Sequence, residues 1–517
     1  MEIVLCLFYG LVFILIIRRA GFFKVEGLGR WFIATVFILK IFAGLLLWAV
    51  YTFYYTDRLS ADIYKYFDDS RYMFEALKSN PADFLGMLSG LGDQSYYFTR
   101  YYLHMNNWDS PFYSSLYNDS HLMIRFNAIV RIFSFGYFNV HTVFMCFISL
   151  SGLTAVYKSF VPFIRDKSRE LAAVIFLLPS VLFWSSGVLK EGFLFFSAGM
   201  LIYHVFCISA GRMSLRSLYW IVFSATLLAI VKFYVLISLL PGLTLFYILK
   251  KTSPRFVLAK AALVMTAYAA IGLNTHHFLP LHSPLEVLRM KQRDFVGLAN
   301  GGTYLINDSL FAYISPENHD AVLPAGGGKF HIRQGSAYYY WKNNNTKDTI
   351  FVYASTDTVR YSLFSDHPRA GSVIKIPPLD GSFLDALGNT PSAILNSLFR
   401  PYPWEARSIL LLLPVFENIL VTAALIACIF FFRWKREISA PFLLCLSFVL
   451  ILAAISGLVT PVLGALVRYR TPALPFLLIT ILFIFDKEKF LKKITMFSGK
   501  RKRTQEKEPV YFSAHAE

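Results

Sequence analysis

The stretch that decides the fold is LAAVIFLLPSVLFWSSGVLKEGFLFFSAGMLIYHVFCIS, residues 171–209. It holds two apolar runs, joined by a short Ser-Ser-Gly segment, and the second run begins with the adjacent charges Lys190 and Glu191. A helix needs about 20 apolar residues to cross the roughly 30 Å hydrocarbon core of a bilayer. The stretch therefore predicts two membrane-crossing helices joined by almost no loop, with a charged tip at the membrane surface.

The rest of the chain repeats this apolar pattern. Of its 517 residues, 56% are hydrophobic and only 16% are charged, which is too apolar for a water-soluble globule. We therefore predict an all-α polytopic membrane protein in a lipid bilayer, because helices satisfy their own backbone hydrogen bonds there. About eleven spans are expected, at 1–17, 31–54, 138–157, 170–185, 189–209, 217–232, 234–249, 257–278, 408–432, 439–458 and 470–485.

The basic residues give the topology. They give a formal net charge of +18 and form short clusters in alternate connections rather than one amphipathic face, so we expect no nucleic-acid partner. By the positive-inside rule the clusters mark the cytoplasm, which places the N-terminus outside and the C-terminus inside, in a multi-pass protein of a bacterial inner (plasma) membrane. The clusters are Arg18/Arg19/Lys24/Arg30, Lys158/Arg165/Lys167/Arg169, Arg212/Arg216, Lys250/Lys251/Arg255 and Arg433/Lys435/Arg436.

These spans divide the chain into six segments. The first outer loop has the apolar spacing of surface helices, and the second has β-rich runs such as GGTYLI between Gly and Asn turns. The predicted segments are 1–54, two transmembrane helices; 55–137, an extracytoplasmic loop with surface helices and an acidic motif; 138–278, helices three to eight; 279–407, a β-rich extracytoplasmic insertion; 408–486, helices nine to eleven; and 487–517, a basic cytoplasmic tail.

An acidic pair in the first outer loop is the first candidate for chemistry. Asp68 and Asp69, in KYFDDSRYMFEAL, follow the second span by about a dozen residues. A carboxylate just above the bilayer can deprotonate an acceptor hydroxyl, or hold a divalent cation such as Mg²⁺ or Mn²⁺ beside a phosphate, for which Asp69 is the candidate ligand. The alternative is that the pair only solvates or caps the surface helix.

Four cations form the second candidate. Lys190, Lys232, Arg468 and Arg470 lie at the expected outer ends of spans far apart in the sequence. Ionisable groups at that depth are costly and are usually paired or functional. Cations at the boundary of the headgroups are placed to bind the phosphate of a lipid carrier, and arginine offers a bidentate fork. The alternative for each residue is snorkelling to lipid headgroups.

A third polar group lies around the start of the ninth span. Arg400 and Glu405 approach this span, and Glu417 lies two to three turns within it, as a buried carboxylate expected to pair with Lys190, Lys232 or Arg468. We expect these residues and Glu191 to support the site.

Three stretches carry a family resemblance. YFDDSRYMFEAL resembles the acidic motif in the first outer loop of the GT-C superfamily of polyprenyl-phosphate-dependent glycosyltransferases, which includes protein mannosyltransferase-like and aminoarabinose-transferase-like enzymes. LVRYRTPALPFLL resembles their basic stretch near the end of the chain, and FWSSGVLKEGFLFF a short outer hairpin of some polysaccharide polymerases. The resemblance implies Asp68 or Asp69 as the catalytic or metal-binding carboxylate, and a lipid-phosphate role for Arg468 and Arg470, with Lys190 nearby.

The working hypothesis is transfer of a sugar from a polyprenyl phosphate to a glycan, lipid or protein acceptor at the extracytoplasmic face. Asp68 or Asp69 would act as base or metal ligand, and the four cations would stabilise the charge growing on the donor phosphate. Two alternatives are a polysaccharide polymerase that joins lipid-linked repeats, and a transporter or flippase for a lipid-linked solute. A transporter would need inverted repeats or broken helices near the midplane, which the sequence does not show.

Overall fold

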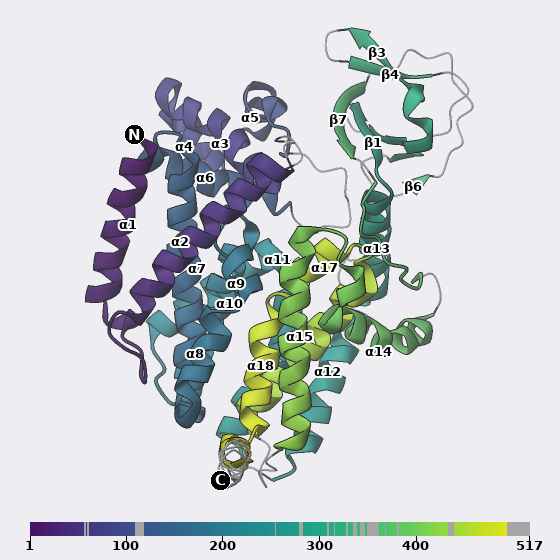
Figure 1. Ribbon diagram of the computed structural model, residues 1–517. Helices are drawn as coiled ribbons and strands as arrows, with labels where there is room; N and C mark the ends of the chain where they lie inside the picture. The colour runs from purple at the N-terminus through teal and green to yellow at the C-terminus, as the bar shows by residue number, and fades with distance from the viewer. Residues whose placement is uncertain are drawn as a thin grey trace, which may run out of the picture.

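The fold is that of a computed structural model (Figure 1), which describes residues 1–55, 58, 61–108, 118–253, 255–278, 283–307, 310–314, 316–326, 329–333, 339–341, 347–348, 361–367, 369–379, 382–432 and 439–493. The cluster Arg433/Lys435/Arg436, much of the β-rich insertion and most of the predicted basic tail lie outside these residues.

The N-terminal part is a helix pair and a cap. Two apolar helices are followed by a layer of further helices, and Figure 1 shows this layer at the end of the bundle where the chain begins. The elements are α1 (Glu2–Arg19), η1 (Gly21–Phe23), α2 (Phe32–Ala49) with the π-turn η2 (Val50–Tyr54), then α3 (Asp62–Ser79), α4 (Pro81–Ser89), α5 (Gln94–Arg100), η3 (Tyr102–His104) and α6 (Ser120–Ser134).

A central bundle carries most of the core. Its largest hydrophobic cluster joins residues from both ends of the chain, and α7 and α10 pack most closely where Gly152 faces the backbone of Phe195 and Phe196. The bundle comprises α7 (Phe138–Phe160), η4 (Val161–Phe163), η5 (Arg165–Lys167), α8 (Ser168–Phe176), α9 (Pro179–Trp184), α10 (Lys190–Ser209), α11 (Leu215–Lys251) and α12 (Val257–Phe278).

Helix α11 reverses direction at Lys232. This residue has φ −155° and ψ 80°, outside helical geometry. Trp220, before the break, stacks on His204, and Phe246, after it, stacks on Phe206 at 3.8 Å between ring centroids. A straight helix would separate Trp220 and Phe246 by about 39 Å, so both can reach the same end of α10 only if the arms fold back. The predicted hairpin between spans 217–232 and 234–249 is confirmed, with Lys232 at its tip.

The second predicted outer segment contains a small sheet. Helix α13 (Pro284–Asn300) leads to strands that project beyond the bundle (Figure 1), in the order β3-β4-β7-β1-β2-β5-β6, and their described pairs are antiparallel. The elements are β1 (Gly302–Asn307), β2 (Leu310–Ile314), η6 (Pro316–Ala321), β3 (Val322–Gly326), β4 (Lys329–Ile332), β5 (Tyr339–Trp341), β6 (Lys347–Asp348), β7 (Tyr361–His367) and the amphipathic α14 (Phe383–Phe399).

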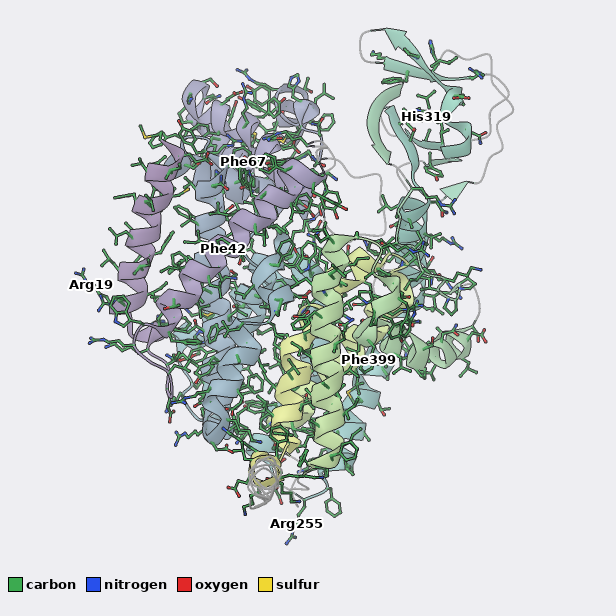
Figure 2. All side chains as sticks on the ribbon, viewed as in Figure 1. Arg19, Phe42, Phe67, Arg255, His319 and Phe399 are labelled. Carbon is green, nitrogen blue, oxygen red and sulfur yellow. The ribbon has the colours of Figure 1, made fainter. Side chains whose placement is uncertain are left out.

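The C-terminal helices complete the bundle. They are η7 (Pro403–Glu405), α15 (Ile409–Phe430), α16 (Ala440–Val459), α17 (Leu463–Arg470) and α18 (Ala473–Ile484). Helix α16 packs between α11, α14 and α18, while α12 and α15 leave many large apolar side chains exposed, among them Leu263 and Ile429. Figure 2 shows Arg255 at the end of the molecule away from Phe67 and His319.

By length and composition, seven of the described helices can cross a membrane, or eight if α17 and α18, bent by 55°, count as one span. The protein is therefore a mostly helical, membrane-embedded chain. The seven are Phe32–Tyr54, Phe138–Phe163, Lys190–Ser209, Leu215–Lys251, Val257–Thr275, Ile409–Phe430 and Ala440–Val459. This count treats the α11 hairpin as one helix. The sequence-based prediction of eleven spans exceeds the count of eight by three, because it places two spans in α11 and also counts α1 and the broken α8–α9 pair as spans.

Candidate functional site at the α10 and α11 tips

A buried ion-pair network lies where α10 begins. The Arg468 guanidinium on α17 donates from Nε and Nη2 to the two carboxylate oxygens of Glu191, at 2.7 and 2.9 Å. Its Nη1 donates to Oδ2 of Asp62, the first residue of α3, at 2.6 Å. The Glu191 side chain is only 2% exposed, whereas that of Asp62 is 34% exposed. Arg468 thus joins α17 to α10 and to α3.

Lys190, next to Glu191, forms a second ion pair. Its Nζ lies 2.6 Å from Oδ1 of Asp119, which precedes α6, and 5.1 Å from the ring centre of Tyr66 on α3. The adjacent residues Lys190 and Glu191 therefore have opposite charges and different partners, Asp119 before α6 and Arg468 on α17.

Lys232 is the third cation of this network. Its ammonium group lies 4.8 Å from the ring centre of Tyr469, and its charge interacts with Glu191 and Asp119. Within the described part of the chain it makes no hydrogen bond or ion pair, unlike Lys190 and Arg468. Lys232 is thus a half-buried cation in contact with an aromatic ring and close to carboxylates that already have partners.

Both surface carboxylates of the network are held in the ionised form. Burial favours the neutral acid, but the Arg468 charge, with Lys65 and Lys190, outweighs it and holds the pKa of Asp62 below its ordinary value. Burial likewise opposes ionisation of Asp119, and Lys190 and Lys232 together hold its pKa below the ordinary value. We name these six residues the tip charge network: Asp62, Asp119, Lys190, Glu191, Lys232 and Arg468.

The structure does not bring Asp68 and Asp69 into this network. Asp69 is 1% exposed and accepts hydrogen bonds from the backbone N–H groups of Asn106 and Asn107, at 3.0 and 2.8 Å, and from the Asn107 side-chain amide at 3.1 Å. Burial raises the pKa of Asp69 despite these donors. Asp68 forms a bidentate pair with Arg58 at 2.7 and 2.9 Å on the surface. The sequence placed Asp68 or Asp69 beside the cations, but the aspartate that pairs with Arg468 is Asp62, about 10 Å earlier along the helix axis than Asp69.

The surroundings of Asp69 do not fit a divalent cation. Mg²⁺ and Mn²⁺ need free oxygen lone pairs, whereas three N–H donors point at this carboxylate. Among the described residues, no group of three or more His, Cys, Asp or Glu side chains is arranged to hold a metal ion. We therefore assign no chemical step to a metal at Asp69.

Arg470 also lies apart from the tip charge network. Its guanidinium, fully buried, donates to the carbonyl oxygens of Ser397, Leu398 and Arg400 at the C-terminus of α14, and to Oδ1 of Asn418 at 2.6 Å. Those contacts satisfy carbonyl groups that a helix end leaves free. The local geometry thus makes Arg470 a cap for α14.

The third predicted group stays together but faces other partners. Arg400 pairs with Glu405 at 3.0 Å, and the Glu417 carboxylate accepts hydrogen bonds from the backbone N–H and the hydroxyl group of Ser180 on α9. Glu417 therefore does not pair with Lys190, Lys232 or Arg468 as expected. Its electrostatic partner is Arg470. Glu417 thus joins α15 to α9 through Ser180, while Arg470 joins α17 to the end of α14.

Sequence reasoning missed two members of the network as partners. Asp62 and Tyr66 are four residues apart, on one face of α3, and this spacing was available in DIYKY. Asp119 lies in the polar stretch YNDSH, just before α6, and nothing in the spacing links it to Lys190.

The chain was compared with protein-family models, with curated proteins and with solved structures, and no match was found.

Proposed function

We propose that the protein is a membrane glycosyltransferase that moves a sugar from a polyprenyl-phosphate donor to an acceptor at the extracytoplasmic face. In this proposal the chain has eleven spans in a bacterial inner membrane, with its N-terminus outside and its C-terminus in the cytoplasm. The network then lies at the outer rim of the bilayer, where the phosphate of a lipid carrier lies. The acceptor is a glycan, a lipid or a protein.

The observation that carries the proposal is the meeting of Lys190, Lys232 and Arg468 at one level of the bundle, from segments far apart in the sequence. Three cations in a partly desolvated site stabilise negative charge far better than cations in water. Lys232 has no carboxylate bound to it among the described residues, so it can bind a phosphate oxygen without breaking an existing ion pair. Arg468 and Lys190 would add to this binding by exchanging their carboxylate partners for phosphate oxygens.

The carboxylates supply the other half of the chemistry. Asp62 and Asp119 have side chains 34% and 29% exposed, so an acceptor hydroxyl group can approach either of them. The attacking oxygen forms a bond to the anomeric carbon and passes its proton to the carboxylate. The bond between that carbon and the phosphate oxygen breaks, and its electron pair stays on the phosphate, opposite the cations. In this step Asp62 or Asp119 acts as the base, the role that the sequence predicted for Asp68 or Asp69.

The test is transfer of a labelled sugar by the purified chain in proteoliposomes, using a panel of polyprenyl-phosphate hexoses. We expect Lys232→Met to lower kcat/KM at least tenfold, about 1.4 kcal/mol. Lys251→Met, which removes an exposed charge at the other end of the same hairpin, should leave activity unchanged. Asp62→Asn and Asp119→Asn identify the base, with Asp68→Asn as the control on the same surface helix.

Three outcomes would overturn the proposal. Equal activity of the Lys232 and Lys251 variants would remove the phosphate site. A product ladder formed from lipid-linked oligosaccharides would indicate a polymerase instead, and movement of the lipid-linked sugar between leaflets without any product would indicate a carrier.

A further inference from the structure

A cavity lies at the opposite end of α10 from the tip charge network. It has a volume of about 760 Å³ and is bounded by η1, α7, α10 and the start of α11. His204 lines it and lies fourteen residues after Lys190 on the same helix, which places it about 21 Å further along the axis. The cavity is therefore distinct from the network of the proposed glycosyltransferase.

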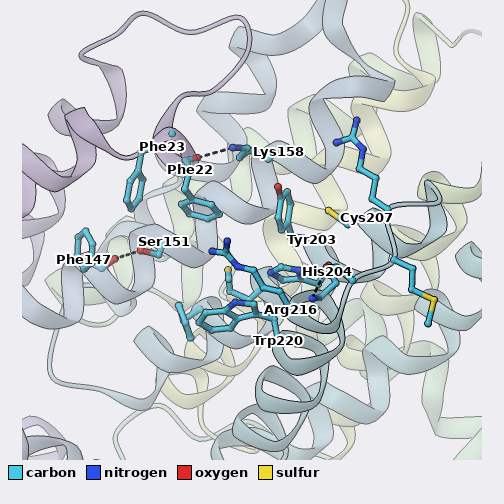
Figure 3. A pocket seen from close by; sticks show the side chains of 17 residues that line it. Phe22, Phe23, Phe147, Ser151, Lys158, Tyr203, His204, Cys207, Arg216 and Trp220 are labelled. Carbon is cyan, nitrogen blue, oxygen red and sulfur yellow. Dashed lines mark hydrogen bonds between the residues drawn. The ribbon is translucent and has the colours of Figure 1, made fainter.

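The cavity is apolar over most of its wall. Phe22, Phe23, Phe147 and Trp220 contribute aromatic rings, and Figure 3 shows these rings arranged around the open space. Phe22 and Lys158 are held together, since the lysine Nζ donates to the Phe22 carbonyl oxygen at 2.9 Å. Such a surface suits hydrocarbon chains, which gain free energy when apolar area leaves water.

The polar part of the cavity is cationic. Arg212, Arg216 and Lys158 line it, and Figure 3 shows the Arg216 guanidinium extended into the space near Phe22 and Ser151. The lining contains no Asp or Glu among the described residues. The first arm of α11 also begins here, capped by Ser214, so backbone N–H groups at a helix N-terminus add to the positive potential.

One buried polar atom in the lining has no partner. His204 is 7% exposed and stacks on Trp220 with an interplanar angle of 9°, yet its Nδ1 forms no hydrogen bond with any described group. A buried polar atom without a partner costs free energy, so its position in the wall of a cavity indicates a ligand atom that completes it.

From these contacts we infer that the cavity binds an anionic phospholipid, with its phosphate at Arg212 and Arg216 and its acyl chains against the phenylalanine rings. A free phosphate would use the cations but not the aromatic wall. Basic pockets between membrane helices bind anionic headgroups in this way. The site would hold the turn between α10 and α11, and through that turn the hairpin that carries Lys232.

The test is native mass spectrometry of the full-length protein in detergent, titrated with phosphatidylglycerol, phosphatidylcholine or inorganic phosphate. We expect phosphatidylglycerol to bind at least tenfold more tightly than phosphatidylcholine. Arg216→Gln should weaken this binding at least tenfold, and Ser151→Phe should do so by filling the space without changing charge. Arg255→Gln is the matched control, because it removes an exposed arginine outside the cavity lining.

Equal binding of the two lipids, or equal binding by the Arg216 and Arg255 variants, would overturn the inference. Displacement of the lipid by millimolar inorganic phosphate would overturn the lipid assignment in favour of a free-anion site. None of these results depends on sugar transfer, so they are independent of the proposed activity.

Discussion

Replacing Arg468 by glutamine should destabilise the protein by about 3–5 kcal/mol, because the substitution leaves a buried carboxylate without its partner. The Glu191 side chain, 2% exposed, bears nearly all of this cost. Asp62, 34% exposed, is reached by solvent and adds only about 0–1 kcal/mol. Arg71→Gln is the control, since the Arg71–Glu75 pair at 2.6 Å lies on the surface, and its loss should leave the free energy of unfolding nearly unchanged.

A double-mutant cycle separates the ion pair from general damage. Glu191→Gln alone leaves Arg468 with Asp62, whereas the double variant replaces the buried pair by two neutral amides. We expect the double variant to lose about 2–3 kcal/mol less in its free energy of unfolding than the sum of the losses in the two single variants. The free energy of unfolding would be measured by SDS titration in mixed micelles. Strict additivity, or an Arg468 variant no less stable than the Arg71 variant, would refute the reasoning.

Two further predictions concern packing and pH. Gly152→Val should prevent α7 and α10 from packing, because a side chain at Gly152 overlaps the carbonyl group of Phe195. A thermal melt in detergent should then show loss of the folded protein. Gly464→Val is the control and should melt like the unchanged protein, because there is open space around Gly464. Burial, together with Arg125, lowers the pKa of His121 to about 4 although the Trp108 carbonyl opposes this shift. Since the folded state binds fewer protons than the unfolded state below pH 6.5, stability should fall as the pH drops from about 6.5 to 4, by up to about 1.4 kcal/mol per pH unit. Melting at pH 7 and pH 5 tests this, and an equally steep loss in His121→Gln would contradict it.

The sequence predicted the helices better than it predicted the partners of its charges. Apolar runs report membrane-crossing helices directly, so the position of Lys232 at a hairpin tip followed from the lengths of the two runs around it. The gathering of Lys190, Lys232 and Arg468 around the start of α10 followed from the same count, because alternate ends of successive spans lie on the same side. The lengths of the apolar runs therefore predicted which helix ends these charges occupy.

The contacts of individual side chains were not available from these patterns. Asp69 was favoured because it lies in an acidic pair, but it bonds to the chain at Asn107, while Asp62, on nearly the same face of α3 two turns earlier, reaches Arg468. Arg470 was grouped with Arg468, yet residues two apart on a helix point about 200° apart, so Arg470 reaches α14 instead. Contacts such as Lys190 with Asp119 depend on loop paths that no local pattern encodes.

The reversal at Lys232 also restricts how the gene for this protein can change in length. Only one residue leaves helical geometry there, so no loop lies between the two arms that could absorb an insertion or a deletion. One added residue in either arm would turn the apex by about 100° and shift it by about 1.5 Å relative to the rest of that arm. The lysine would then face lipid instead of Tyr469, so we expect related chains to vary in composition along these arms while keeping their number of residues constant.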